Sequence, residues 1–221
     1  MTNEEILRHI DHTLLKAVSS WTEIEKLCSE AILYKTASVC VPPSYVAPIH
    51  KAYGEKLTIC TVIGFPLGYS VSAAKLCEAE AALSGGAREL DMVINLGDVK
   101  NGEFDKIREE ISGLKKTAGN NILKVIVETC YLTGEEKIRL CEIVTHAGAD
   151  FIKTSTGFGT AGAAMDDVLL FKKHIGAGVK IKAAGGVKTR EDLEKFLAAG
   201  CERIGTSSAV ALLSGGGAAA Y

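Results

Sequence analysis

The sequence predicts an α/β protein of the (β/α)8 class, a TIM barrel, folded as a single domain over residues 1–221. Strand-like and helix-like segments alternate from one end of the chain to the other, with short joins between them. These units repeat about every 25 to 30 residues, which suits a small member of the class. No Pro/Ser-rich linker or run of charges divides the chain. A doubly wound open sheet is the alternative architecture.

Composition narrows the class of protein further. The 221 residues are 47% hydrophobic and 24% charged, with a formal net charge of −2, as is typical of a folded domain. This near-neutral balance provides no broad basic surface for nucleic acid or an anionic membrane. No segment approaches the roughly 20 apolar residues that span a bilayer, and the first residues do not look like a secretion signal. We expect a cytoplasmic protein whose partners are small molecules, not nucleic acid or a membrane.

The cysteines do not form a recognisable metal or disulfide pattern. Seven cysteines are widely spaced, without a C-x-x-C pair, and no two histidines have the spacing of metal ligands. We expect most of these cysteines to be buried free thiols, and we expect no metal site.

Helices are predicted where apolar residues recur three and four positions apart. A short helix is expected over about residues 2–9, ahead of the first strand. Three later helices open with capping-box pairs, at Ser20/Glu23, Thr133/Glu136 and Thr189/Asp192. Gly200 suits the left-handed residue that ends the last of them. Residues 214–221 form a Gly/Ala-rich tail.

Eight strand-like runs lie between the helices. They span residues 10–14, 37–41, 57–63, 88–95, 122–129, 150–155, 179–184 and 201–206. Gly86, Gly148 and Gly200 each stand just before a strand that follows a helix, and this weak internal repeat supports the count.

Polar residues within the strands share one parity. Successive side chains point to opposite faces of a strand, so each run divides into an apolar set and a polar set. The polar set comprises Ser38, Cys40, Glu89, Asp91, Asn95, Lys124, Glu128, Lys153, Ser155, Lys180 and Lys182. Since the apolar set must face the helices, the polar set is predicted to point toward the barrel axis. An unpaired buried charge costs several kcal/mol, so these groups need partners, solvent or a function.

Lys153 and Lys182 stand late in neighbouring strands, near the mouth where barrel enzymes bind substrates. Adjacent strands lie about 4.8 Å apart, so the two ammonium groups can approach each other in a partly dry cavity. Like charge and burial would let one of them lose its proton easily, which is how a Schiff-base lysine is activated. Asp91 could balance the lysine charges and relay protons through water. The alternative is an ion network that only fixes strand register.

Other inward residues receive simpler interpretations. Lys124 could form a second pair with Glu128. For Lys180 the ion network that only fixes strand register is favoured, because it is expected deeper in the barrel, toward the rim opposite the mouth. Cys40 is expected to be a small buried hydrophobe and not a nucleophile, because no histidine partner is evident.

Two loops predict a phosphate site. Gly185-Gly186-Val187-Lys188 follows the seventh strand, and Gly205-Thr206-Ser207-Ser208 follows the eighth. Loops at these two places often bind phosphate in barrels, because glycine lets the backbone approach the ligand and hydroxyls add donors. Taken singly, the first loop could be a turn and the second a helix cap.

Six motifs together resemble the deoxyribose-phosphate aldolase family, in the right order and over nearly the whole chain. They are Asp11-His-Thr-Leu-Leu, Glu89-Leu-Asp-Met-Val-Ile-Asn95, Lys124-Val-Ile-Val-Glu-Thr129, Phe151-Ile-Lys-Thr-Ser-Thr-Gly-Phe158, Lys182-Ala-Ala-Gly-Gly-Val-Lys188 and Gly205-Thr-Ser-Ser208. The resemblance implies a metal-independent class I aldolase without a cofactor, commonly a homodimer. Its implied reaction is reversible cleavage of 2-deoxy-D-ribose 5-phosphate to acetaldehyde and D-glyceraldehyde 3-phosphate, in deoxyribonucleotide and deoxynucleoside catabolism.

The resemblance also implies roles for particular residues. Lys153 matches the Schiff-base lysine, Lys182 the neighbour that helps it to lose a proton, and Asp91 the proton-transfer group. Asp11, Thr13 and Cys40 match positions that line the substrate pocket. Implied phosphate contacts fall on Gly157, Phe158, Gly185, Gly186, Val187, Lys188, Gly205, Ser207 and Ser208. A terminal tyrosine is frequent in the family, so Tyr221 could assist proton transfer.

Two other functions remain open at this point. A phosphosugar isomerase on the same barrel would share the phosphate loops but would need acid–base carboxylates instead of a lysine pair. A non-catalytic sugar-phosphate-binding barrel would use the lysines only to hold an anion.

Overall fold

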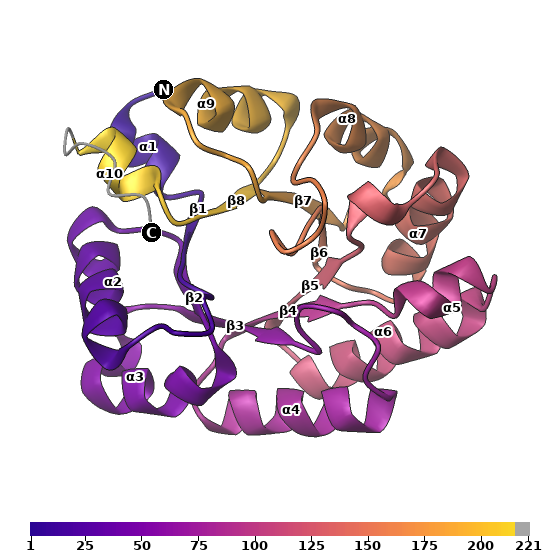
Figure 1. The fold of residues 1–221 in the computed structure, drawn as a ribbon, viewed down its shortest axis with the longest axis horizontal. Helices are drawn as coiled ribbons and strands as arrows, with labels where there is room; N and C mark the ends of the chain where they lie inside the picture. The colour runs from indigo at the N-terminus through magenta and orange to yellow at the C-terminus, as the bar shows by residue number, and fades with distance from the viewer. Residues whose placement is uncertain (215–221) are drawn as a thin grey trace.

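Eight parallel strands close into a barrel in which each strand pairs with the next and β8 pairs with β1 (Figure 1). The computed structural model describes residues 1–214. The strands are β1 (Ile10–Thr13), β2 (Ser38–Val41), β3 (Ile59–Ile63), β4 (Glu89–Val93), β5 (Ile122–Ile126), β6 (Phe151–Lys153), β7 (Lys180–Ala184) and β8 (Arg203–Thr206). The predicted TIM barrel is confirmed, and the doubly wound alternative is wrong.

Helices surround the barrel on its outside (Figure 1). They are α1 (Asn3–Leu7), α2 (Trp21–Tyr34), α3 (Val46–Tyr53), α4 (Ser72–Ser84), α5 (Leu96–Lys100), α6 (Phe104–Ala118), α7 (Gly134–His146), α8 (Met165–His174), α9 (Arg190–Ala199) and α10 (Ala209–Leu213). Within residues 1–214 there are also three short 3-10 helices, η1 (Pro43–Tyr45), η2 (Gly54–Lys56) and η3 (Thr129–Tyr131). No described helix is both long and apolar enough to cross a membrane.

The helix starts agree with the capping signals. The three predicted capping boxes form at the N-termini of α2, α7 and α9, and Gly200 ends α9 in the left-handed conformation with φ of 109°. The expected N-terminal helix forms as α1, with its own capping box at Thr2 and Glu5. The tail prediction for 214–221 lies outside the described residues from 215 onward, and so does the prediction for Tyr221.

Several strands are shorter than predicted at their carboxyl ends. Asn95 is not in β4 but caps α5, where its side chain accepts a hydrogen bond from the Gly97 N–H. Glu128 lies two residues beyond β5 in a left-handed conformation, and Ser155 lies beyond β6. The inward parity therefore does not extend to these residues, because parity holds only while the chain stays extended.

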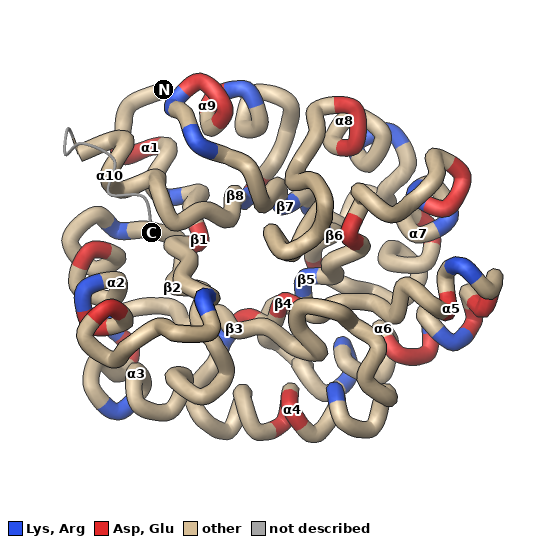
Figure 2. The backbone as a smooth tube through the Cα atoms, viewed as in Figure 1, with Lys and Arg blue, Asp and Glu red and all other residues tan. Residues whose placement is uncertain are grey.

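The barrel separates an apolar layer from a polar interior. Apolar residues of one strand parity pack against the helices, for example Val39, Leu90, Val125 and Ile152. The opposite parity fills the interior with buried charged residues, and Figure 2 shows charged positions on the strands as well as on the helices. Of the seven cysteines, all of which are free thiols, five are buried, as predicted for most of them.

Candidate active site

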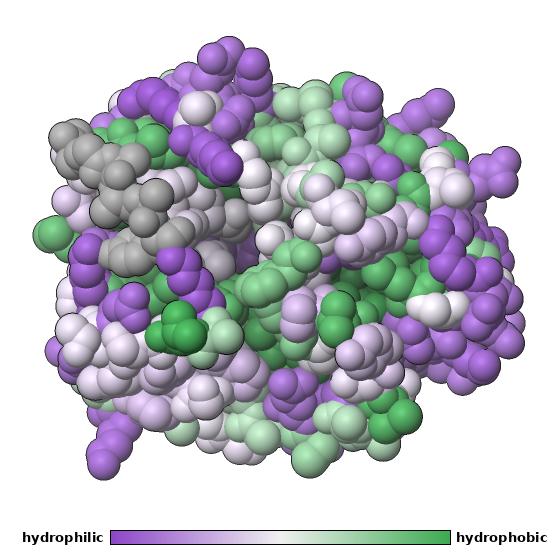
Figure 3. Space-filling model, in the orientation of Figure 1, coloured by the Kyte–Doolittle hydropathy of each residue, from purple (hydrophilic) through white to green (hydrophobic). Residues whose placement is uncertain are grey.

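A cavity of about 460 Å³ opens beside Lys153, at the carboxyl ends of the strands. Its lining comes from the carboxyl ends of β1, β6, β7 and β8, from the loops that follow them, and from Leu212 of α10. This volume lies in the range of small-molecule sites, and its place at the carboxyl ends of the strands is where barrels bind substrates. In Figure 3, apolar and neutral side chains gather over the middle of the face shown, and hydrophilic side chains lie toward its rim.

Lys153 and Lys182 lie side by side on β6 and β7, where they are register partners. Their Nζ atoms donate to the same oxygen, Oδ2 of Asp91, at 2.7 Å and 2.6 Å. Lys153 lines the cavity, whereas Lys182 is fully buried behind it. The predicted approach of the two ammonium groups is thus confirmed, with the Asp91 carboxylate between them.

The two oxygens of Asp91 have different partners. Oδ2 accepts from Lys153 and Lys182, while Oδ1 accepts from the Lys124 ammonium at 2.8 Å and from the Cys60 thiol at 3.2 Å. Hydrogen bonds on both sides fix the plane of the carboxylate. One oxygen is therefore held by the barrel interior, and the other faces the lysines at the mouth.

Charge interactions set the ionisation of this group. Burial would raise the pKa of Asp91, but Lys124, Lys153 and Lys182 hold it well below its usual range. Burial would lower the pKa of Lys182, but the carboxylates of Asp11 and Asp91 raise it above its usual value. Asp91 is consequently an ionised carboxylate and Lys182 a cation near neutral pH.

A deeper ion network supports these groups. Lys124 contacts the carboxylates of Glu89 at 2.6 Å, Asp91 at 2.8 Å and Asp11 at 3.5 Å. Arg203 pairs with Asp11 and Glu89, and Lys182 donates to Asp11. The predicted Lys124–Glu128 pair is wrong, because Lys124 reaches these carboxylates and the Glu128 carboxylate is buried against Thr156 in the loop after β6. Lys180 lies at the start of β7, away from the mouth as predicted, but it is exposed and not buried in the barrel interior as its inward parity predicts.

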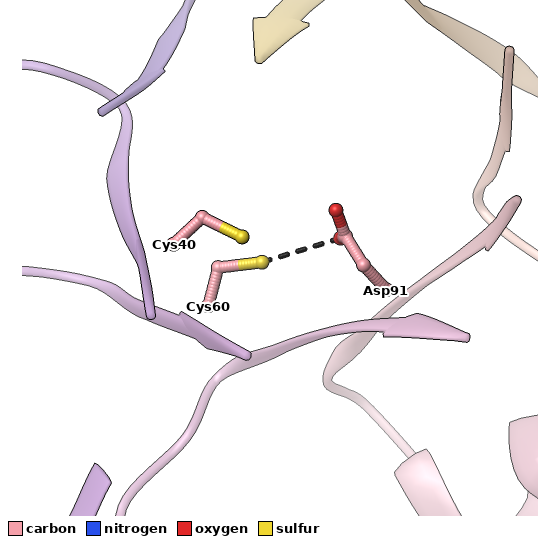
Figure 4. A group of neighbouring side chains, drawn as sticks. All are labelled: Cys40, Cys60 and Asp91. Atoms are coloured by element: carbon pink, nitrogen blue, oxygen red, sulfur yellow. Dashed lines mark hydrogen bonds between the residues drawn. The ribbon is translucent and has the colours of Figure 1, made fainter. Parts of the chain in front are cut away.

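Cys40, Cys60 and Asp91 come from adjacent strands and point toward one another (Figure 4). Their ligand atoms all lie within 4.8 Å of one another, a spacing that could hold a metal ion. However, the ammonium groups of Lys124, Lys153 and Lys182 already surround this carboxylate and would repel a cation. Burial of Cys40 agrees with its interpretation as a small hydrophobe, although Cys60 lowers its pKa by hydrogen bonding.

The nine residues predicted to contact phosphate all line the cavity. They are Gly157, Phe158, Gly185, Gly186, Val187, Lys188, Gly205, Ser207 and Ser208. The β6–α8 and β7–α9 loops meet closely, since a Cβ at Gly162 would lie 2.2 Å from the Gly185 carbonyl oxygen. The Ser208 hydroxyl lies 3.0 Å from that of Thr206, the last residue of β8.

Of the three residues predicted to line the pocket, only Thr13 does. Asp11 and Cys40 are fully buried in the barrel interior and do not line the cavity. The cavity also contains Lys16, which the sequence argument did not single out. Its place three residues after β1 was the available signal, since loops after strands form the mouth. Arg203 and Cys60 were also missed, although both share the inward parity of their strands.

The fold and the site together define the class of protein. It is a barrel enzyme that uses buried lysines and a carboxylate to act on small molecules. Comparison with known proteins shows which family within this class the chain belongs to. A family model described as "DeoC/LacD family aldolase" matches residues 6–215. The chain belongs to this family.

Individual relatives agree with the family. The chain is 62% identical over 215 residues to a deoxyribose-phosphate aldolase of Clostridium botulinum, covering 97% of each chain. It is 55% identical over 210 residues to the deoxyribose-phosphate aldolase of Clostridioides difficile, covering 95% of this chain and 96% of the other. Among solved structures, the tetrameric deoxyribose phosphate aldolase of Aeropyrum pernix aligns with a TM-score of 0.90 and 33% identity, over 96% of this chain and 91% of the other. The aldolase QR15 aligns with a TM-score of 0.91 and 38% identity, over 96% of this chain and 95% of the other.

Proposed function

We propose that this chain is a deoxyribose-phosphate aldolase that works through a lysine Schiff base. It cleaves 2-deoxy-D-ribose 5-phosphate reversibly to acetaldehyde and D-glyceraldehyde 3-phosphate, in deoxynucleoside breakdown. Relatives that carry this name and are 62% and 55% identical over nearly the whole chain support the activity. The observation that carries the mechanism is the position of Lys153, which lies in the cavity wall with its Nζ beside Asp91 and Lys182.

Lys153 is the nucleophile in this proposal. Its neutral amine attacks the C1 aldehyde of the open-chain sugar and forms a carbinolamine, which loses water to give a protonated imine. Lys182 remains a cation throughout, because Asp11 and Asp91 raise its pKa. Lys182 thus keeps a positive charge beside the attacking amine of Lys153, on the same oxygen of Asp91.

Carbon–carbon cleavage then uses the imine as an electron sink. Asp91, through a water molecule, accepts the proton of the C3 hydroxyl while the C2–C3 bond breaks. The electron pair of that bond moves toward the imine and forms an enamine. D-glyceraldehyde 3-phosphate leaves at this step. Protonation of the enamine at C2, followed by hydrolysis of the imine, then releases acetaldehyde and restores the free amine of Lys153.

The phosphate group binds in the loops after β7 and β8 in this proposal. Gly185 and Gly186 have positive φ, and with Ser207 and Lys188 they line one side of the cavity. Glycine permits close approach of the backbone, while a hydroxyl and an ammonium group add donors. Phosphate held far from the reacting carbons orients the sugar. A homodimer and a cytoplasmic location remain predictions of the sequence.

Borohydride trapping tests the proposed mechanism. Reduction in the presence of acetaldehyde is expected to add one ethyl group to the protein, and peptide mapping is expected to place it on Lys153. Lys153→Ala should abolish both the adduct and the release of acetaldehyde in a coupled NADH assay. Lys180→Ala is the matched control, because Lys180 is exposed at the opposite end of the barrel.

The same experiment separates the other candidate functions. A phosphosugar isomerase would form no reducible adduct, and a binding protein would take up the sugar phosphate without releasing acetaldehyde. An adduct on a different lysine would show that the assigned nucleophile is wrong.

A further inference from the structure

Glu128 has a backbone conformation that is costly for its residue type. Its φ is 53° and its ψ is 67°, in the left-handed region. Among the described residues, only Lys35 and Glu128 combine positive φ with a side chain. Lys35 ends α2, where left-handed residues are common, but Glu128 joins β5 to η3. A strained residue is retained where the surrounding structure makes use of its position.

The Glu128 carboxylate is buried against the loop between β6 and α8. The residue is 3% exposed, and its oxygens accept from the Thr156 N–H at 3.2 Å and 3.3 Å and from the Thr156 hydroxyl. Within the described part of the chain, no cation forms an ion pair with it. A buried carboxylate held only by neutral donors is expensive, so its presence points to a role in this loop.

The loop packs against Glu128 without spare room. A Cβ at Gly159 would lie 2.8 Å from the Cys130 Sγ and 3.1 Å from the carboxyl carbon of Glu128. The Thr156 hydroxyl also accepts a hydrogen bond from the Phe158 N–H at 3.0 Å. Glu128 thus fixes Thr156 directly and Phe158 through it.

The residues held in this way form a wall of the cavity. Thr156, Gly157 and Phe158 all line it, and the chain between β6 and α8 turns in over the barrel (Figure 1). The Phe158 ring meets Phe65 edge to face, with centroids 5.3 Å apart. Phe65 follows β3, so the aromatic pair joins two loops from separate parts of the mouth.

We propose that Glu128 is a positioning residue that holds the β6–α8 loop in its substrate-binding conformation through Thr156. The inference rests on the proposed function, because the bound sugar phosphate is the ligand for which the wall is shaped. Glu128 itself does not touch the reacting atoms. Its loss should weaken sugar-phosphate binding while leaving imine formation at Lys153 intact.

Glu128→Gly is the sharpest test, because glycine removes the carboxylate and adopts the left-handed conformation without strain. Amide hydrogen exchange at Thr156 and Phe158 is expected to accelerate about 10-fold or more, as a hydrogen bond to a charged group is lost. The KM for 2-deoxy-D-ribose 5-phosphate should rise about 10-fold, with kcat within roughly 3-fold of the wild type. Trapping by borohydride at saturating acetaldehyde should be unchanged.

Three further variants control the experiment. Lys35→Gly makes the same backbone change away from the cavity and should alter neither exchange in the loop nor KM. Glu128→Gln keeps one carbonyl acceptor and should recover most of the wild-type KM. In the double variant Thr156→Val/Glu128→Gly, KM and amide exchange in the loop should rise no further than in the more strongly affected single variant. The two substitutions remove the same contact, so their effects should not add.

Each result decides between clear alternatives. Unchanged amide exchange in Glu128→Gly would overturn the anchoring role, and accelerated exchange with an unchanged KM would overturn its link to substrate binding. If the wild-type protein releases no acetaldehyde, the proposed function fails, whereas the exchange comparison still decides whether Glu128 holds the loop.

Discussion

At the scale of single residues, the site depends on how one carboxylate divides its contacts. Asp91 meets Lys124 and Cys60 with one oxygen and Lys153 and Lys182 with the other. The first pair fixes its orientation from inside the barrel. The second pair brings two amines to a single point, so a change at one amine alters the electrostatic surroundings of the other.

Lys182→Met is expected to slow imine formation at neutral pH. Removing the cation takes away one of the two ammonium groups that meet at Oδ2 of Asp91, and so changes the electrostatic surroundings of the attacking amine. The rate of borohydride trapping at pH 7 should fall about 10-fold. Lys182→Arg keeps the charge and should retain most of the wild-type rate. If both variants trapped at the wild-type rate, the charge of Lys182 would have no part in activation.

The sequence identified these lysines but could not rank them. Parity and position along the strands selected Lys153, Lys182 and Asp91 together, since all three break the apolar pattern of a barrel interior. Only the resemblance to a family named Lys153 as the nucleophile. The structure adds a physical reason for choosing Lys153, because Lys153 lines the cavity and Lys182 does not. The sequence assigned Glu128 to the wrong partner, Lys124, because its left-handed backbone ends the strand parity and no sequence signal indicates a left-handed glutamate.

At the scale of elements, a second buried ion pair ties helices to the strand that carries Asp91. Lys75 of α4 donates to Glu110 of α6 at 2.9 Å and to the backbone carbonyl of Val93, the last residue of β4, at 2.9 Å. Ser72 adds a hydrogen bond to Glu110 at 3.0 Å. Both charged side chains are buried, so the pair links α4, α6 and β4 without solvent screening.

Lys75→Met is expected to destabilise the protein by about 3 to 5 kcal/mol, because it leaves the buried Glu110 carboxylate without its cation. The free energy of unfolding in urea measures this loss. Lys75→Met combined with Glu110→Leu should recover much of it, since two apolar side chains replace two charges. Lys195→Met, which removes the exposed Lys195–Glu191 pair, should change stability little. A double variant as unstable as Lys75→Met would show that packing, and not the unpaired charge, sets the cost.

Element starts were easier to predict than strand ends. Capping boxes such as Thr133/Glu136 are local, because both partners lie within four residues. The carboxyl ends of the strands depend instead on loops that come from elsewhere in the chain. Asn95 and Ser155 continue the alternation of their strands in sequence, but Asn95 becomes a helix cap and Ser155 enters the β6–α8 loop.

At the scale of the whole molecule, buried titratable groups limit the pH range of stability. Burial lowers the pKa of His12 despite its contact with Glu30, and neighbouring cations hold the pKa values of Asp11 and Asp91 below their usual range. Burial raises the pKa of Cys28 to about 12, and those of Cys141 and Cys201 to about 12 as well. The folded state therefore resists protonation in acid and thiol ionisation in base.

The free energy of unfolding is expected to be highest between about pH 6.5 and pH 9. Below pH 6.5 the unfolded chain takes up a proton at His12 that the folded chain resists, and below about pH 4 it also protonates Asp11 and Asp91. Above pH 9 the unfolded chain loses thiol protons that the folded chain keeps, at about 1.4 kcal/mol per pH unit for each thiol. Urea denaturation under reducing conditions across pH measures the profile, and Cys141→Ala should reduce the alkaline slope. A slope identical to the wild type would refute the assignment to buried thiols.

The ion network inside the barrel has a further consequence for electroneutrality. Its connected carboxylates are Asp11, Glu89 and Asp91, and its connected cations are Lys124, Lys153, Lys182 and Arg203. Fully ionised, this interior carries one surplus positive charge, which vanishes when a single amine gives up its proton. Lys153 alone among these seven side chains borders the cavity, so the surplus proton has its exit to solvent at the atom that must react.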